Sequence, residues 1–221
     1  MEQGDSWARE LTRRVGQGVR QKRESSGMSA QQVSDRTADV GMRVSRARIA
    51  ALESGERGGE VKVAELIVLA RALMIPPLAL LYPGVPGERV VAFPAAEGET
   101  TSIDAAMWFA GESPHGVLLP LPGGGEVYTY WGDDWSDFED GAALLRLGRR
   151  ESEKLATLSR KKGERHKAEE RGASDAEMAL LATDISALEK DIREIRETVR
   201  RLGGEPGHLG PAHSYLDGRE V

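Results

Sequence analysis

The residues best suited to chemistry are two arginines near the start of a short predicted helix, Ser45–Ser54. Serine at the first position favours a helix start because its hydroxyl accepts a hydrogen bond from a backbone N–H group. Ile49 and Leu52 have the spacing of a buried side, so Arg46 and Arg48 are expected to face outward. A guanidinium group donates paired hydrogen bonds to a carboxylate, to a phosphate or to the O6 and N7 atoms of guanine. These two arginines are therefore candidate binding residues.

Other residue types that often form sites give weaker patterns. The four histidines lack the mutual spacing of metal ligands and are expected at the surface: His115, His166, His208 and His213. The glycines at 123–125 are not followed by Lys and Ser or Thr, so they indicate a hairpin turn rather than a phosphate-binding loop. An acidic run lacks the alternating oxygen ligands and the glycine of a calcium loop, and we interpret it as a solvated loop: Asp133, Asp134, Asp137, Glu139 and Asp140.

The composition excludes further classes of site. There is no cysteine, so disulfides and thiolate metal sites are ruled out. No Ser–His–Asp arrangement or carboxylate pair stands out, so the sequence predicts no enzyme activity, no cofactor and no metal. The first thirty residues contain no apolar run suited to a signal peptide, and no stretch approaches the length of a membrane span. The expectation is a cytoplasmic protein without a membrane partner.

Charge is unevenly distributed along the chain, whose net charge is −6. Residues 1–82 carry 13 Lys and Arg against 10 Asp and Glu, a net of +3. Residues 83–148 carry 2 against 11, a net of −9, and residues 149–221 carry 15 of each sign. Because nucleic acids are polyanions, only the N-terminal part has the sign of charge expected of a nucleic-acid binder.

Five short helices are predicted in the N-terminal part. In the first, Trp7, Leu11 and Val15 recur every four residues, which is typical of an amphipathic helix. The second begins at the capping residue Ser29, and Pro77 is tolerated at the start of the fifth. The predicted spans lie at about residues 7–26, 29–37, 45–54, 63–73 and 77–81.

Several short motifs within residues 11–81 occur in a characteristic order. They are Gly27-Met28-Ser29, the run Val44-Ser45-Arg46-Ala47-Arg48-Ile49 with its ending Leu52-Glu53-Ser54-Gly55, and the apolar stretch Val63–Leu73. The ordered set resembles the xenobiotic-response-element family of helix-turn-helix transcriptional regulators, which includes the phage repressors, in its actinobacterial version. The resemblance covers about a third of the chain. It implies a five-helix domain whose third helix enters the major groove of double-stranded DNA.

The resemblance also implies two groups of DNA contacts. Base contacts are expected on the third helix, at Arg46, Ala47 and Ala51, and Arg48 is added because its position there could reach a base or a phosphate. Phosphate contacts are expected near helix starts and in the turn before the third helix: Ser29, Gln31, Gln32, Arg43, Ser45, Arg57 and Lys62. The family's usual glutamine clamp is replaced by Ala30, so either Gln31 or Gln32 would take its place or that contact would be absent.

The rest of the chain has a different pattern. Residues 84–140 indicate a small, acidic, aromatic-rich α+β segment, with a strand at 89–93, a short helix at 103–110 and a hairpin of 117–121 with 127–131. Helical spacing returns from residue 142, and Gly172 separates it from a last helix capped by Ser174. In an antiparallel hairpin the basic stretch 160–167 would face the acidic start of that helix; contact of this stretch with DNA is the alternative.

The most regular pattern is a heptad seam in the last helix. Its apolar residues alternate steps of three and four: Met178, Leu181, Ile185, Leu188, Ile192, Ile195, Val199 and Leu202. We interpret the seam as a dimerisation surface, while the pattern leaves open whether it pairs within or between chains. Gly203 ends the helix, and residues 204–221, rich in Gly, Pro and His, are predicted to be a disordered tail.

The predicted fold is therefore mainly α. It comprises a helix-turn-helix domain (1–83), the α+β segment (84–140), a helical hairpin or coiled coil (141–203) and the tail (204–221). The first functional hypothesis is a sequence-specific transcriptional regulator, a homodimeric repressor, because a dimer reads two half-sites about 34 Å apart. The alternative is an antitoxin or adaptor whose middle segment and coiled coil bind a protein partner.

Overall fold

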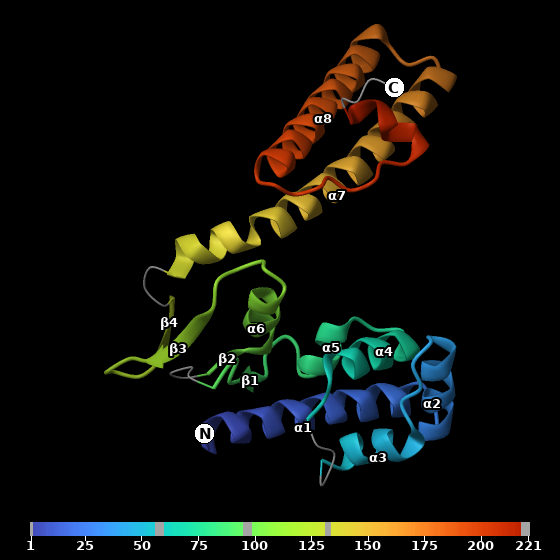
Figure 1. Cartoon of the computed structure of the whole chain (residues 1–221). Coiled ribbons are helices and arrows are strands. Elements are labelled where there is room, and N and C mark those ends of the chain that lie inside the picture. Colours follow the sequence, from blue (N-terminus) through green and yellow to red (C-terminus); the bar gives the residue numbers. More distant parts are fainter. Residues whose placement is uncertain (1, 56–59, 95–98, 131–133, 218–221) are drawn as a thin grey trace. The chain divides into compact units, whose positions relative to one another are not determined.

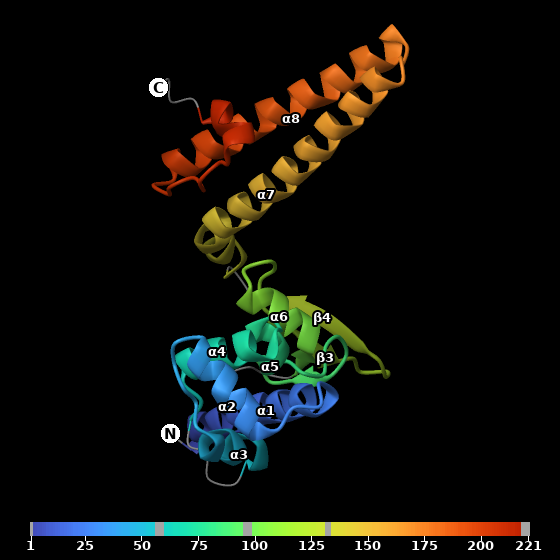
Figure 2. The ribbon, with the colours of Figure 1, turned by 90° about the vertical axis from the view of Figure 1, so that its right-hand side faces the viewer.

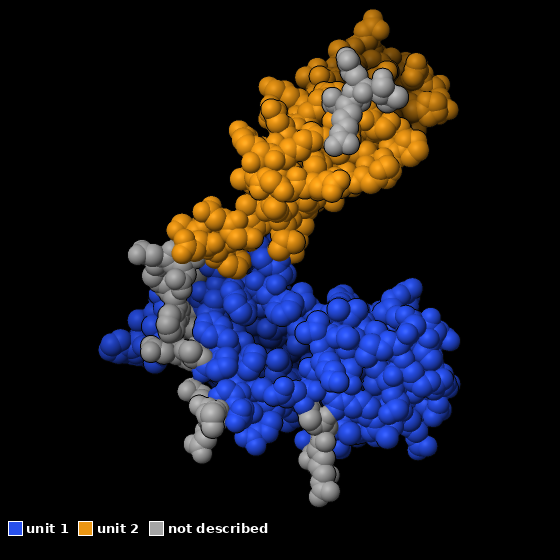
Figure 3. All heavy atoms as spheres, in the orientation of Figure 1, with its two compact units in different colours: residues 1–132 blue, residues 133–221 orange. Residues whose placement is uncertain are grey.

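The chain folds into two compact units, residues 1–132 and 133–221, each with a hydrophobic core of its own (Figure 3). The computed structural model describes residues 2–55, 60–94, 99–130 and 134–217. Helices make up most of both units, and the strands gather in the middle of the chain (Figure 1). The predicted mainly helical class, with a small α+β segment followed by a helical hairpin, is confirmed.

The first unit begins with the helices that the apolar spacing predicts. They are α1 (Glu2–Ser25), α2 (Ala30–Asp39), α3 (Arg46–Ser54), α4 (Val63–Leu73) and α5 (Pro77–Leu81). At the start of α3, Ser45 Oγ accepts a hydrogen bond from the Arg48 N–H group at 3.1 Å. Gly55 ends α3 in the left-handed region, with φ 69°, a conformation that glycine adopts without a steric cost.

A close approach of two backbones fixes α3 on α1. A Cβ atom added to Gly16 would lie 1.9 Å from the Leu52 carbonyl oxygen, so a larger residue there would push the two helices apart. Both ribbon views show α1 to α5 gathered into one bundle (Figures 1 and 2). Its core consists of buried apolar side chains: Val15, Val19, Val33, Ile49, Leu52, Leu69, Leu73 and Leu80.

The middle segment contains two short antiparallel sheets and one helix. Its elements are β1 (Arg89–Val90), β2 (Thr100–Thr101), α6 (Ser102–Phe109), β3 (Gly116–Pro120) and β4 (Glu126–Tyr130). The predicted hairpin is formed by β3 and β4, each of which begins and ends one residue earlier than predicted. The chain turns at Gly124 and Gly125, which both have positive φ. The strand predicted at 89–93 is shorter than expected: β1 pairs with β2 over two residues, Arg89 with Thr101 and Val90 with Thr100.

The core of the first unit continues into the middle segment. Val90, Ala92 and Ala105 are buried in the same cluster as the helices α1 to α5, and the Trp7 Nε1–H group donates to the Val91 carbonyl at 3.1 Å. The sequence predicts a domain boundary between residues 83 and 84, but the compact unit extends to residue 132. The linker-like composition of Pro83 to Gly87 marks a turn between packed elements rather than a separation of cores.

The second unit is a helical hairpin of α7 (Asp134–Glu170) and α8 (Asp175–Arg201). Ion pairs cross the hairpin, with 3.0 Å between Lys161 Nζ and Asp184 Oδ2 and 3.3 Å between Lys162 Nζ and Glu189 Oε1. The basic stretch of α7 therefore faces acidic residues of α8, as the antiparallel interpretation predicts.

The C-terminal segment differs from its prediction. Residues 204–221 are expected to be disordered, yet Leu209 and Leu216 are buried against Leu158 and Ile192 of the hairpin. A 3-10 helix, Pro211–Leu216, holds this segment in place, and residues 218–221 lie outside the described range. The prediction is wrong because glycine and proline mark irregular backbone, which is not the same as absence of packing when apolar residues lie between them.

Across the described residues, no helix combines the length and the apolar character that crossing a membrane would need.

Candidate nucleic-acid interface

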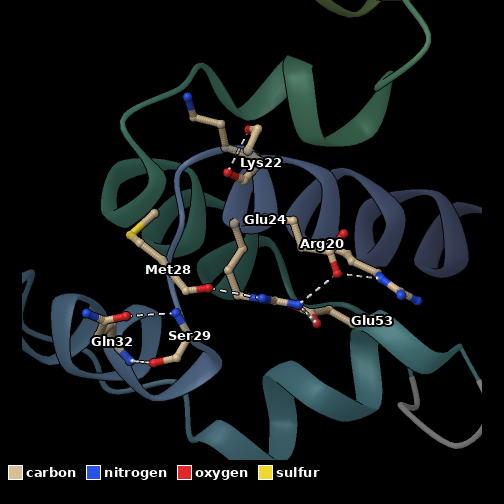
Figure 4. Close-up of polar contacts among 9 residues, drawn as sticks. Arg20, Lys22, Glu24, Met28, Ser29, Gln32 and Glu53 are labelled. Atoms are coloured by element: carbon tan, nitrogen blue, oxygen red, sulfur yellow. Dashed lines mark hydrogen bonds and ion pairs between the residues drawn. The ribbon is translucent and has the colours of Figure 1, made fainter.

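Two arginine–carboxylate pairs hold α3 against its neighbours. In the first, Arg23 near the end of α1 donates from Nε to Glu53 Oε1 at 2.7 Å and from Nη2 to Glu53 Oε2 at 2.8 Å (Figure 4). The same guanidinium donates from Nη1 to the Met28 carbonyl at 3.0 Å. Both charged side chains are largely buried. This fork therefore ties together α1, the turn before α2 and the last turn of α3.

The second pair joins α3 to α4. Arg48 donates from Nε to Glu65 Oε1 at 2.9 Å and from Nη2 to Glu65 Oε2 at 2.8 Å, and Nη2 also donates to the Glu60 carbonyl. Hydrogen bonding from Arg48 is the main reason why the pKa of the Glu65 carboxyl lies below its ordinary value. Arg48 is predicted as a base contact, but its guanidinium is hydrogen-bonded to Glu65 within the domain. The spacing within α3 could not reveal this, because Glu65 lies on another helix.

The outward side of α3 carries small side chains and one cationic side chain. Arg46, Ala47 and Ala50 are exposed, whereas Ala51 is half-buried. The Arg46 guanidinium makes no hydrogen bond or ion pair within the part of the chain that the structure describes. Of the predicted base contacts, Arg46 therefore keeps all its donors available, and Ala47 offers a methyl group.

The start of α2 forms a closed capping arrangement. Ser29 Oγ accepts from the Gln32 N–H group at 3.2 Å, and Gln32 Oε1 accepts from the Ser29 N–H group at 2.8 Å (Figure 4). This reciprocal pair leaves the backbone N–H groups of Ala30 and Gln31 without a partner inside the helix. The Ser29 hydroxyl accepts the bond from Gln32 and keeps its own O–H donor, so the predicted phosphate contact at Ser29 stays a prediction.

Two further predicted phosphate contacts share one carboxylate. Gln31 Nε2 and Arg43 Nη1 each lie 3.0 Å from Asp35 Oδ1, so the long turn before α3 is connected to α2. The Arg43 and Asp35 side chains are more than half exposed. Exposed ion pairs of this kind contribute at most about 1 kcal/mol, so a phosphate can compete for Arg43.

Three predicted phosphate contacts remain: Ser45, Lys62 and Arg57. Ser45 is exposed, but its hydroxyl caps α3. Lys62 is exposed at the start of α4, where its N–H group donates to Glu65 Oε2 at 3.2 Å. Arg57 lies outside the described residues.

An aromatic cluster in the middle segment was not anticipated. Phe93, Trp108 and His115 have ring centroids 4.6 to 5.7 Å apart. Both ring nitrogens of His115 are buried and have no hydrogen-bond partner among the described residues. Burial lowers the pKa of the imidazole, opposed by the charge of Asp104. The prediction of a surface histidine is therefore wrong for His115. A single histidine between loop residues gives no periodic signal that would indicate packing.

The heptad seam of α8 is covered within the chain. Ile185 and Ile192 cluster with Leu158 of α7 and with the C-terminal Leu209 and Leu216. The seam residues Leu181, Ile185, Ile192, Ile195 and Val199 are buried, Met178 and Leu188 are half-buried, and Leu202 is exposed. The seam predicted for dimerisation is therefore an intrachain contact except at Leu202. A heptad pattern has the same form whether the facing helix belongs to the same chain or to another.

Among the described residues, no three His, Asp or Glu side chains gather as metal ligands would. Comparisons of the chain with protein-family models, with curated proteins and with solved structures give no match.

Proposed function

We propose that this chain is a sequence-specific DNA-binding transcriptional regulator that inserts α3 into the major groove of double-stranded DNA. The observation that carries the proposal is how α3 is supported. Glu53 and Arg48 fix its inner side to α1 and α4, while Arg46 and Ala47 remain outward at its first turn. A helix that reads bases needs rigid support together with accessible side chains at its N-terminal end.

The chemistry of base reading would rest mainly on Arg46. Its guanidinium can donate two hydrogen bonds to guanine O6 and N7, an interaction worth about 1–3 kcal/mol of discrimination against other bases. Ala47 would contribute an apolar contact, for example to a thymine methyl group. Because Arg48 is bonded to Glu65, one copy of the domain would contact few bases and would discriminate weakly between DNA sequences.

Phosphate contacts would hold the domain in register on the duplex. The unpaired N–H groups of Ala30 and Gln31 at the start of α2 suit a phosphate oxygen, because the helix dipole adds positive potential there. Arg43 in the turn before α3 and Lys62 at the start of α4 are exposed and supply positive charge. Residues 1–82 carry a net charge of +3, which agrees in sign with attraction to DNA.

The regulator would act as a homodimeric repressor that occupies its operator. One copy of α3 offers few base contacts, whereas a two-fold dimer reads two half-sites about one helical turn apart.

Selection of bound sequences from random duplex DNA tests the proposal directly. We expect enrichment of a two-fold symmetric site with guanine in each half-site. Recovery of no preferred sequence would contradict the proposal, and a stoichiometric protein partner co-purifying with the chain would favour an antitoxin or adaptor instead.

Replacement of Arg46 by alanine tests the assigned base contact. We expect Arg46→Ala to weaken binding to the selected site by about 1–3 kcal/mol and to leave binding to unrelated DNA much less affected. Lys190→Ala is the matched control, because it removes one exposed positive charge from α8. Equal losses of affinity for selected and unrelated DNA, measured at fixed salt, would indicate that Arg46 contacts a phosphate rather than a base.

A further inference from the structure

Arg14 of α1 is a buried cation without a hydrogen-bonding partner among the described residues. The residue is only 5% exposed, and its guanidinium makes neither a hydrogen bond nor an ion pair within the described ranges. It lies over the ring of Tyr82, with 5.9 Å between Arg14 Cζ and the ring centroid. An aromatic face attracts a cation but uses none of the five N–H donors of an arginine. The nitrogens of Arg14 are not among the fully enclosed polar atoms, so a solute can reach them.

The groups around Arg14 do not neutralise it. Glu10, one turn earlier on α1, makes a fork with Arg13, with 2.8 Å from Arg13 Nε to Glu10 Oε2 and 2.6 Å from Arg13 Nη2 to Glu10 Oε1. Tyr82 is 4% exposed, and its phenol makes no hydrogen bond with a described residue. Burial raises the pKa of Tyr82, opposed by the charge of Arg14, so the phenol keeps its proton. Two neighbouring buried side chains thus carry donors that the fold leaves unused.

Arg14 lies on the side of α1 that faces α5, away from α3. A Cβ atom at Gly16 would meet Leu52 of α3, whereas one at Gly18 would lie 3.0 Å from the Leu80 carbonyl oxygen of α5. Two positions along a helix are about 200° apart, so these contacts lie on opposite sides of α1, and Arg14 shares the side of Gly18. Both ribbon views show α3 and α5 on opposite sides of α1 (Figures 1 and 2). DNA held by α3 would therefore not reach Arg14.

A carboxylate with one negative charge matches these unused donors. A planar guanidinium bonds the two oxygens of a carboxylate side by side, and one uncompensated cation is balanced by one negative charge. A phosphate dianion would need a second cation, but the adjacent Arg13 is bonded to Glu10. Tyr82 belongs to the apolar core of the first unit, so its ring favours an apolar or aromatic ligand body.

We propose that Arg14 and Tyr82 form a binding site for a small organic monocarboxylate with an apolar or aromatic body, at the junction of α1 and α5. The ligand carboxylate accepts two hydrogen bonds from Arg14, and the ligand body packs against the ring of Tyr82. Burying an unpaired charge is unfavourable, and a ligand that supplies the missing acceptors removes that cost. The site does not depend on the proposed DNA binding.

Calorimetric titration of the full chain with sodium benzoate, without DNA, tests the site. We expect a dissociation constant of about 0.1–1 mM. Arg14→Met should raise that constant by about tenfold or more, because methionine keeps the length of the side chain but donates no hydrogen bond. Arg20→Met is the matched control, since Arg20 is an exposed arginine of the same helix that is paired with Glu24, and its benzoate affinity should be unchanged. Benzamide has the shape of benzoate without its charge and should not bind measurably.

Thermal unfolding provides a second arm of the test. Without ligand, Arg14→Met should unfold at the same temperature as the unmodified chain or at a higher one, because it removes an unpaired guanidinium from the interior. Benzoate should raise the unfolding temperature of the unmodified chain and of Arg20→Met, but not that of Arg14→Met. A shift that depends on Arg14 distinguishes binding at this site from a general effect of the salt.

Three results would overturn the site: no benzoate binding below about 10 mM, equal benzoate affinity in Arg14→Met, or binding of inorganic phosphate in place of benzoate. A large fall in the unfolding temperature of Arg14→Met without ligand would also overturn it, because the guanidinium would then already be satisfied within the fold. The DNA selection is scored separately. Arg14-dependent benzoate binding with no preferred DNA sequence would reject the proposed function and leave this site standing.

Discussion

At the residue scale, two arginines in neighbouring positions of one helix have opposite surroundings. Arg48 makes a fork with Glu65 that is mostly shielded from solvent, whereas Arg46 is exposed. We expect Arg48→Ala to destabilise the fold by about 1–3 kcal/mol, because the Glu65 carboxylate loses its partner in a partly buried place. Arg46→Ala should leave the free energy of unfolding nearly unchanged. Urea denaturation of both variants makes the comparison, and equal stabilities would contradict the assignment of Arg48 to the interior.

We expect His115 to make the free energy of unfolding depend on pH. Burial lowers the pKa of its imidazole below the ordinary 6.5 in the folded chain, so the unfolded chain binds the proton more readily. The contribution of His115 is complete above about pH 6.5 and is lost as pH falls through the interval between the two pKa values. We expect His115→Phe to lose less free energy of unfolding than the unmodified chain between about pH 7.5 and 5.5. Parallel pH profiles would show that His115 is not the group that titrates.

At the element scale, the position of α3 depends on one glycine of α1. Gly16→Ala would place a methyl group against the Leu52 carbonyl, and we expect a loss of about 1–3 kcal/mol from the forced displacement. Gly4→Ala in the same helix is the control, because nothing lies within 4 Å of its Cβ position. The control should be neutral or stabilising by about 0.5–1 kcal/mol. Thermal unfolding distinguishes the two, and identical shifts would mean that α3 does not pack as closely as described.

At the scale of the whole molecule, the two cores should respond separately to mutation. Arg196 is only 2% exposed and is neutralised by Glu151 of α7 and Asp217 of the C-terminal segment. Asp217→Asn should therefore reduce hydrogen-exchange protection in α7 and α8 and leave α1 to α5 unaffected, since Asp217 contributes nothing to their core. Gly16→Ala should have the reverse pattern. Equal loss of protection in both units after either change would contradict separate cores.

The sequence by itself determined the local structure of this protein. The N-terminal helices, the caps at Ser29 and Ser45, the hairpin around Gly124 and the antiparallel α7–α8 pair all follow from side-chain spacing and turn chemistry, which act over a few residues. The candidate interface was predictable to the same extent: the outward place of Arg46 and Ala47 follows from helical periodicity alone.

Only the tertiary structure decided which of these residues are available to bind a ligand and which are occupied within the chain. Arg48 and Arg46 look alike in the sequence, and they differ because Glu65, 17 residues beyond Arg48, lies against one of them. Likewise, the α8 seam meets α7 and the C-terminal Leu209 and Leu216 of its own chain. Periodicity specifies which side of a helix is buried, but the partner is chosen by packing between segments far apart in the chain, where spacing carries no information.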